Sequence, residues 1–141
     1  MATIFRLPAS PESLNQLSSK TMVETLGIEF VEVGEDFVRA RMPVDGRTVQ
    51  PFGILHGGAN ATLAETVASV AATLCCDPGK QVAVGVELNA NHIRSVRSGF
   101  VYGTARPLHL GRSTHVWDVR IEDEEGMLVC ASRLTLLIKD R

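Results

Sequence analysis

The stretch GILHGGANATLAETVASVAATLCC, residues 53–76, decides the fold. After the Gly57–Gly58 pair it predicts one helix of about 30 Å, at 1.5 Å per residue, which the turn signal DPG at residues 77–79 ends. The apolar side chains of this helix leave no broad solvated face, so other parts of the chain must cover it on nearly every side. We therefore expect a curved antiparallel sheet wrapped around a central helix.

The segments on either side of this helix alternate in the way that is typical of β-strands. Residues 28–44 alternate around a turn at residues 34–36, which predicts a hairpin. Four strand segments separated by short turn signals follow the helix and predict a mainly antiparallel meander; they are residues 81–96, 99–110, 113–123 and 127–139. Residues 10–26 predict one or two short helices. The expected fold is a single α+β domain over residues 1–141, with five to six strands and an N-terminal helical segment at 1–26.

The composition excludes several classes of protein. The 141 residues are 45% hydrophobic and 21% charged, with a net charge of −2, which predicts one globular domain with a real core. No run of basic residues is present, which argues against nucleic-acid binding. We expect no signal peptide and no membrane span. Three cysteines and four histidines lack the spacing of a disulfide framework or a metal site, so we expect a cytoplasmic protein with reduced thiols and no bound metal.

Glu65 is the only charged side chain in residues 48–76. Thr62, Glu65, Ser69 and Thr73 follow one another at spacings of three and four, so they form a narrow polar stripe on an otherwise apolar helix. A Glu in this position either points to a solvated edge or has a chemical role. The stripe favours the second reading, because a polar groove along a buried helix is what a substrate channel needs.

The glycine pair at the start of the helix has two explanations. It is either a plain hinge or a place where a substrate carbonyl approaches the unpaired N–H groups of the first turn. Such amides can form an oxyanion hole, which stabilises the negative charge on a carbonyl oxygen under attack. Gly58 and Glu65 are separated by seven residues, about 10 Å along the helix axis, so one carbonyl cannot reach both in a single chain. A two-fold dimer with antiparallel central helices would bring them together.

The segments QPFGILHGGANATLAETVAS, NANHIRS and PLHLGRST resemble the hotdog-fold acyl-CoA thioesterases. More narrowly, the sequence is similar to the branch with a catalytic Glu on the central helix, which includes aryl-CoA, dihydroxynaphthoyl-CoA and enterobactin-proofreading thioesterases. The resemblance covers residues 27–139. It implies a hotdog fold, hydrolysis of a thioester, and an active site shared between subunits of a homodimer or a tetramer built from two dimers.

The resemblance also implies roles for individual residues. Glu65 would be the nucleophile or the general base, and Gln50 and His56 would flank the helix-start amides of Gly57 and Gly58. Ser69 would orient the carboxylate or the water, although a helical Ser can instead bond to the carbonyl one turn back. The residues that match substrate-binding and CoA-binding positions of the family are Gly85, His92, Ile93, Arg94, Ser95, His109, Leu110, Gly111, Arg112, Ser113 and Thr114.

Other readings of these residues stay open. By strand alternation His92 shares a face with Val82, Val84, Val86 and Leu88, so it ends an apolar strand face and could be an ordinary core residue. His56 could be satisfied by backbone contacts. Arg94, Arg106 and Arg112 would suit phosphates, whereas we expect Arg97 to be a solvated strand residue. The expected lining of the acyl pocket, together with residues of the facing subunit, is Val67, Val70, Leu74 and Phe52.

The predicted function is hydrolysis of an acyl-CoA thioester, or of an acyl-carrier-protein thioester, with an aromatic or medium-length acyl group. We expect no cofactor, because coenzyme A is part of the substrate. One alternative is a non-catalytic acyl-CoA-binding module. The other is a hydratase or dehydratase on the same fold, which the Glu in this setting fits poorly.

Overall fold

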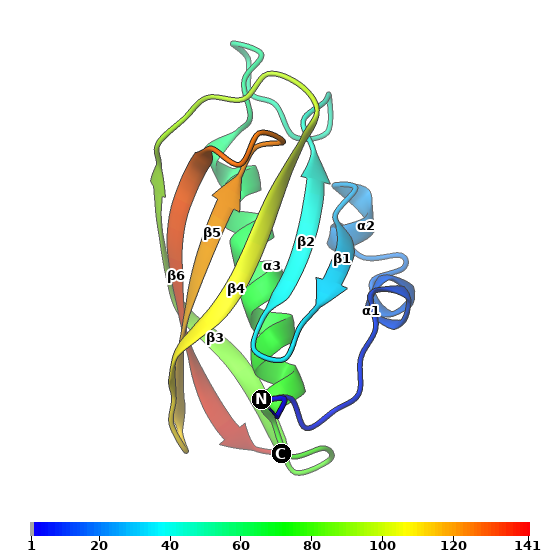
Figure 1. The fold of residues 1–141 in the computed structure, drawn as a ribbon, viewed down its shortest axis with the longest axis vertical. Helices are drawn as coiled ribbons and strands as arrows, with labels where there is room; N and C mark the ends of the chain where they lie inside the picture. The colour runs from blue at the N-terminus through cyan, green and yellow to red at the C-terminus, as the bar shows by residue number, and fades with distance from the viewer. Residues whose placement is uncertain (1) are drawn as a thin grey trace.

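The computed structural model describes residues 2–141 as three helices and six strands (Figure 1). The central helix is α3, and the strands form a single sheet. The bounds are α1 Pro11–Leu17, α2 Met22–Thr25, β1 Glu29–Val33, β2 Val38–Pro43, α3 Gly57–Cys75, β3 Gln81–His92, β4 Phe100–Leu110, β5 Thr114–Glu122 and β6 Leu128–Asp140. The predicted order of two strands, one long helix and four strands is confirmed.

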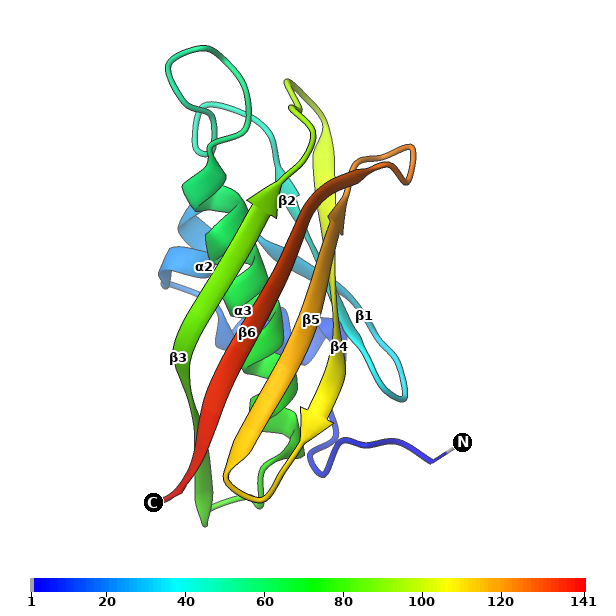
Figure 2. The same ribbon diagram turned by 90° about the vertical axis from the view of Figure 1, so that its left-hand side faces the viewer.

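The six strands pair antiparallel in the order β1-β2-β4-β5-β6-β3 and curve around α3 (Figures 1 and 2). This confirms the α+β class and the wrapped helix. The predicted simple meander is wrong at one place, because β3 pairs with β6 and not with β4. Residues 93–99 carry the chain back across the sheet, so the turn signal at Ser98-Gly99 ends a longer loop.

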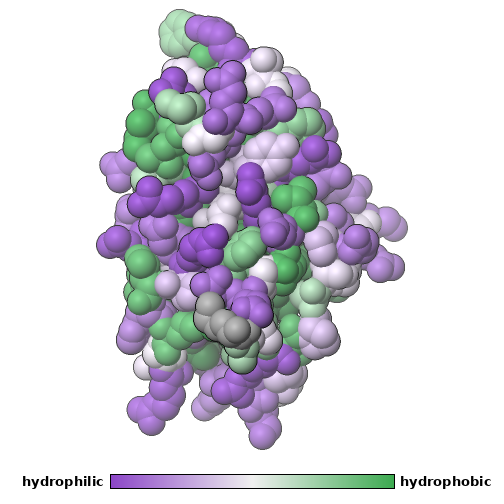
Figure 3. All heavy atoms as spheres, in the orientation of Figure 1, coloured by the Kyte–Doolittle hydropathy of each residue, from purple (hydrophilic) through white to green (hydrophobic). Residues whose placement is uncertain are grey.

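Close packing between α3 and the sheet forms the core. Leu63, Val67 and Ala68 on α3 have no exposed area, nor has Trp117 on β5. A Cβ on Gly103 of β4 would lie 3.2 Å from the Leu63 Cγ atom, so the missing side chain lets helix and strand approach. The outward face of the sheet is largely hydrophilic (Figure 3), as expected for a sheet buried on one side only.

The N-terminal helical segment is attached to the edge of the sheet. Ser10 caps α1 in a reciprocal capping box with Ser13, as the sequence predicts. The Asn15 side chain then binds the free edge of β1: its Nδ2 donates to the Phe30 carbonyl at 3.1 Å, and its Oδ1 accepts from the Phe30 N–H at 2.7 Å. This amide contact covers an edge that would otherwise be open for pairing.

A register shift in β3 changes which residues face the helix. The bulge lies between Gly85 and Glu87, so the alternation on one side of it does not continue on the other. Ala83 and Leu88 both pack on the core, although their sequence positions have opposite parity. The expectation that His92 shares a face with Val82 is therefore wrong, because the inserted residue reverses the alternation between them.

His115 on β5 is a buried histidine in the wall of the sheet. Its Nδ1 accepts a hydrogen bond from Trp117 Nε1 at 3.3 Å. Burial, with a smaller contribution from the charge of His109, lowers the pKa of His115. The unfolded chain therefore binds a proton more readily than the folded chain, so stability is present above the ordinary pKa of 6.5 and is lost as the pH falls through the folded-state pKa.

We predict that the urea midpoint of the protein falls between about pH 7.5 and pH 5.5, and that it falls less in His115→Gln. The Gln Oε1 atom can still accept from Trp117 Nε1, so the variant removes the titrating group and keeps the acceptor. Equilibrium urea unfolding at several pH values measures the difference. Equal slopes in the two proteins would show that His115 does not couple folding to pH.

Candidate active site

The start of α3 leaves one backbone donor open. His56 is the N-cap, and its Nδ1 atom accepts from the Gly58 N–H at 2.7 Å. No residue among 2–141 accepts a hydrogen bond from the Gly57 N–H. Because the His56 Nδ1 atom accepts, the ring proton lies on Nε2 and can be donated outward. The helix start therefore offers the Gly57 amide and not the Gly58 amide, which corrects the expectation that both are open.

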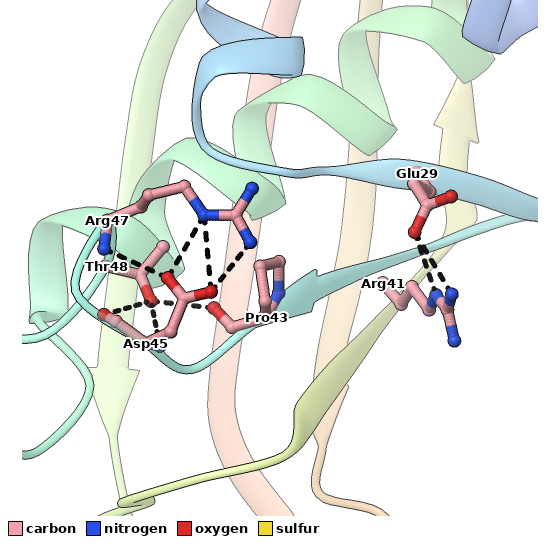
Figure 4. Close-up of polar contacts among 6 residues, drawn as sticks. All are labelled: Glu29, Arg41, Pro43, Asp45, Arg47 and Thr48. Atoms are coloured by element: carbon pink, nitrogen blue, oxygen red, sulfur yellow. Dashed lines mark hydrogen bonds and ion pairs between the residues drawn. The ribbon is translucent and has the colours of Figure 1, made fainter.

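A hydrogen-bonded turn holds the chain that leads to this helix start (Figure 4). Thr48 Oγ1 donates to the Pro43 carbonyl at 2.7 Å and accepts from the Asp45 N–H at 3.2 Å. Asp45 in turn accepts from the backbone and guanidinium of Arg47, which lower the pKa of the Asp45 carboxyl. The Thr48 carbonyl accepts from the His56 N–H at 2.8 Å, so this turn fixes where α3 begins.

Gln50 is oriented by the same loop. Its side-chain Oε1 accepts from the Phe52 N–H, and its Nε2 has no acceptor in residues 2–141. The amide therefore presents two N–H groups as donors. Arg97 Nη1 donates to the Phe52 carbonyl at 3.2 Å, which ties residues 93–99 to this loop. Arg97 is exposed, as expected, but the expectation that it lies in a strand is wrong, because it belongs to a loop and holds another loop in place.

Gln50 and Gly57 line one pocket of about 260 Å³ at the helix start. His92 enters it from the end of β3, and its Nδ1 lies 3.3 Å from Nδ2 of Asn60 on α3. A Cβ on Gly57 would lie 2.9 Å from His92 Nε2, so the imidazole lies directly against the glycine with the open amide. The pocket brings together six of the predicted site residues, Gln50, Gly57, His92, Ile93, Arg94 and Ser95.

Glu65 lies in a different place, exposed on the open side of α3. Its carboxylate lies against Gly85, where a Cβ would overlap Oε2. Gly85 therefore gives Glu65 room, which is a more specific role than the substrate contact that the sequence predicts. The Ser69 hydroxyl makes no hydrogen bond within the described chain, neither to the Glu65 carboxylate nor to the Glu65 carbonyl.

An apolar groove of about 360 Å³ runs beside Glu65. Its lining is Met22, Val23, Ala61, Thr62, Thr66 and Leu88 in addition to Glu65. The expected lining is wrong for Val67 and Leu74, which face the core, whereas Phe52 is 83% exposed in the loop before α3 and does not line this groove within one chain. Helical periodicity identifies the apolar residues, but only the position of the sheet shows which of them it covers.

The predicted CoA-binding segment at residues 109–114 lies at the other end of the molecule, in the turn between β4 and β5 (Figure 1). A cavity of about 400 Å³ lies at the C-terminal end of α3. Its lining includes Leu110, Gly111 and Arg112 from this turn and Arg6 from the segment before α1. Arg106 does not join them: it pairs with Asp36 at 3.2 Å on the outer face of the sheet. The expectation that Arg106 is available for phosphate is wrong.

Within one chain, the predicted site thus falls into three separate places. The helix-start donors, the carboxylate and the turn at residues 109–114 line different cavities. Gly57 and Glu65 are eight residues apart on one straight helix, about 12 Å along its axis. The carboxylate and the open amide of a single chain cannot contact the same carbon atom.

The chain has known relatives. Residues 52–130 match the Thioesterase superfamily, which is more than half of the chain. A 1,4-dihydroxy-2-naphthoyl-CoA hydrolase from Escherichia coli is 50% identical over 135 residues, covering 96% of this chain and 98% of that protein. The chain belongs to the thioesterase superfamily. The family resemblance of the sequence is therefore confirmed, and the protein is a thioester hydrolase.

Two further comparisons agree with this membership of the thioesterase superfamily. The proofreading thioesterase EntH of Cronobacter turicensis is 50% identical over 127 residues, covering 90% of this chain and 92% of that protein. The crystal structure of a thioesterase from Haemophilus influenzae matches with a TM-score of 0.95 at 48% identity, covering 98% of this chain and 96% of that one. The expected hotdog fold is confirmed.

Sequence reasoning missed three residues of this region: Asn60, Thr48 and Met22. Asn60 had a detectable signal, since a large amide in the second turn of an apolar helix needs an explanation. Thr48 had none, because its partners are backbone atoms of its own loop. Met22 had none either, because only the folded chain brings α2 beside Glu65.

We predict that Gly85→Ala folds but loses activity as a thioesterase. The added Cβ overlaps the Glu65 carboxylate and displaces it, and a shift of about 1 Å at a reacting group reduces the rate by about 100-fold. The control is Gly46→Ala, where an added Cβ meets no atom within 4 Å. Thiol release and thermal unfolding are measured for both variants. Full activity in Gly85→Ala would mean that the position of Glu65 against β3 does not matter for hydrolysis.

Proposed function

We propose that this thioester hydrolase acts on acyl-CoA substrates with an aromatic or medium-length acyl group, at a site shared by two copies of the chain. The observation that carries the proposal is the unpaired Gly57 N–H, which lies in one pocket with the oriented Gln50 amide. Donors placed in this way stabilise the oxyanion that forms when a thioester carbonyl is attacked. Each donor of this kind lowers the activation free energy by about 3–4 kcal/mol.

Glu65 is proposed to come from the other copy of the chain. One edge of β3 pairs with β6, and its other edge has no strand partner within residues 2–141. Val84 and Val86 on this edge strand are 43% and 53% exposed. Pairing of β3 with β3 of a second copy would cover these valines and set two α3 helices antiparallel. The exposed Glu65 of each would then face the helix start of the other. Two such dimers could pair into a tetramer.

The chemistry needs only the substrate, water and these side chains. As general base, Glu65 takes a proton from water while the oxygen attacks the thioester carbon, and the carbonyl electron pair moves to the oxygen held by Gly57 and Gln50. The C–S bond then breaks, the thiolate takes up the proton, and the acid and free CoA leave. As nucleophile, Glu65 would form a mixed anhydride that water hydrolyses. In a single turnover in ¹⁸O-water, label that appears in the Glu65 carboxylate would exclude a purely general-base route, because only water that attacks the Glu65 carbon of the anhydride places label in the enzyme.

The CoA arm is proposed to lie along residues 92–95 of one copy, with the turn at residues 109–114 of the other copy contributing donors. Arg94 and Arg112 are exposed and carry the cationic groups that phosphates prefer. The apolar groove beside Glu65 would take the acyl group. The Escherichia coli relative is named for an aromatic acyl-CoA, which supports the aromatic reading. A carrier-protein thioester is the alternative donor of the same acyl group.

The remaining parts of the proposal concern the setting of the enzyme. Cys75, Cys76 and Cys130 form no disulfide, and burial raises the pKa of Cys75 to about 11, which keeps this thiol protonated. Such thiols suit a reducing compartment, so we propose a cytoplasmic enzyme without a further cofactor. None of the helices in residues 2–141 has the length and apolarity that crossing a membrane requires.

We predict that Glu65→Gln lowers kcat for benzoyl-CoA and hexanoyl-CoA by about 1,000-fold or more, because the amide can neither accept a proton nor attack. Glu125→Gln, on the turn between β5 and β6, makes the same change far from α3 and serves as the control. Thiol release and isothermal titration are measured for both esters. A wild-type protein that binds both esters and hydrolyses neither would instead be an acyl-CoA-binding module.

We also predict that two inactive variants restore activity when mixed. Glu65→Gln and His56→Ala each damage a different half of the shared site, so a mixed dimer carries one intact site. After unfolding and refolding together at equal amounts, the mixture should recover about a quarter of wild-type activity, since half the dimers are mixed and half their sites are intact. Each variant refolded alone is the control. No recovery in a mixture that forms mixed dimers would show that each site belongs to one chain.

A further inference from the structure

Asn60 is a buried polar side chain that the proposed mechanism does not use. It lies in the second turn of α3 and is 3% exposed. Its Oδ1 atom is fully buried and has no hydrogen-bond partner in the described chain. A buried amide oxygen without a partner lowers stability, so its presence calls for a reason other than stability.

The other end of the amide contacts His92. Asn60 Nδ2 lies 3.3 Å from His92 Nδ1. An amide nitrogen only donates, so His92 Nδ1 accepts and the ring proton must lie on Nε2. The reversed amide would place a donor, not an acceptor, in the buried position without a partner. Buried donors without partners are the rarer case in folded proteins, so the orientation with Nδ2 toward His92 is favoured.

The Nε2 atom of His92 points at the start of α3. A Cβ on Gly57 would lie 2.9 Å from it, and the Gly57 N–H beside it is open. Gln50, Gly57, Asn60 and His92 line the same pocket. With the proton on Nε2, three donors converge on this pocket: the Gly57 N–H, the Gln50 amide and the His92 ring. With the proton on Nδ1, an acceptor would face the place where the oxyanion forms.

We propose that Asn60 is a positioning residue that holds neutral His92 in its Nε2–H form, so that His92 donates a hydrogen bond to an acceptor oxygen of the thioester substrate. This inference rests on the proposed function, since it names the third donor of the same pocket. Asn60 itself does not touch the substrate, because its free oxygen is buried. The oxygen without a partner then lowers the stability of the protein, and the same amide fixes the tautomer of His92.

A purely structural role for Asn60 predicts different behaviour. If the amide only supports the structure, its removal lowers the stability and the activity of the protein together. If the amide positions His92, its removal lowers the activity alone. Asn60→Ala should then keep or raise the melting temperature, because it removes the buried oxygen without a partner and introduces a better helix former.

The decisive measurement is the tautomer of His92, read from ¹⁵N–¹H long-range correlation spectra of the ¹⁵N-labelled full chain at pH 8 without substrate. The four histidines are assigned by single substitutions. In the wild type, the unprotonated ring nitrogen of His92 should be Nδ1. In Asn60→Asp, whose carboxylate can only accept, the unprotonated nitrogen should be Nε2. A wild-type His92 protonated on Nδ1 overturns the proposal whatever the enzyme hydrolyses.

Thiol release from benzoyl-CoA and thermal unfolding complete the test. Asn60→Ala should lower kcat/KM by about 10- to 100-fold, as loss of a group that orients a functional histidine does, with an unchanged or higher melting temperature. Gln16→Ala removes an exposed amide from α1 and should change neither. Wild-type activity in Asn60→Ala, or a loss that follows a fall in melting temperature, overturns the inference. An inactive wild type would contradict the proposed function instead, and the tautomer measurement would still decide the role of Asn60.

Discussion

The burial of α3 by a single curved sheet is the constraint on which the rest of this structure depends. A helix that is apolar on nearly every side cannot remain at a surface, so the strands curve around it and the small residues Ala68 and Gly103 let the layers approach. Six strands of one chain still leave one side of the helix uncovered. Glu65 lies on that side, against the glycine of the edge strand. The same packing thus builds the core and leaves the carboxylate accessible.

The loops at the start of the helix are held in place by hydrogen bonds. Thr48 closes the turn after β2 and accepts from the His56 N–H through its carbonyl. Arg97 holds the next loop against the Phe52 carbonyl. Functional groups that lie on loops need such contacts, because a free loop would lose its geometry to thermal motion. The result is that the Gly57 amide and the Gln50 side chain face one pocket.

Polar groups without hydrogen-bond partners are concentrated in the first turns of α3. The buried Asn60 oxygen without a donor is unfavourable by itself, and it lies on the same helix as the open Gly57 amide and the exposed Glu65 carboxylate. They occur within three turns of one helix, while the outward face of the sheet is an ordinary solvated surface. Polar groups without protein partners that gather in one place are typical of functional sites, since groups held ready for a substrate cannot also be satisfied by the protein.

The sequence predicted much of this and failed in recognisable ways. The helix at residues 57–75, its DPG stop and the hairpin around Gly34 could all be predicted, because they depend on local periodicity and turn residues. The position of β3 beside β6 could not be predicted, since strand order depends on contacts between distant segments. The bulge at Gly85 reversed the predicted parity of His92, and one inserted residue leaves no clear mark in an alternating pattern.

The candidate site divides in the same way. The identity of its chemical groups, with Glu65 as the single charge on an apolar helix and Gly57 at its start, was determined by the sequence alone, because residue type and spacing along a helix are local properties. Only the tertiary structure decided which amide is open, that Asn60 meets His92, and that the carboxylate and the donors of one chain lie apart. Those facts depend on hydrogen bonds and distances between segments, which no pattern along the chain records.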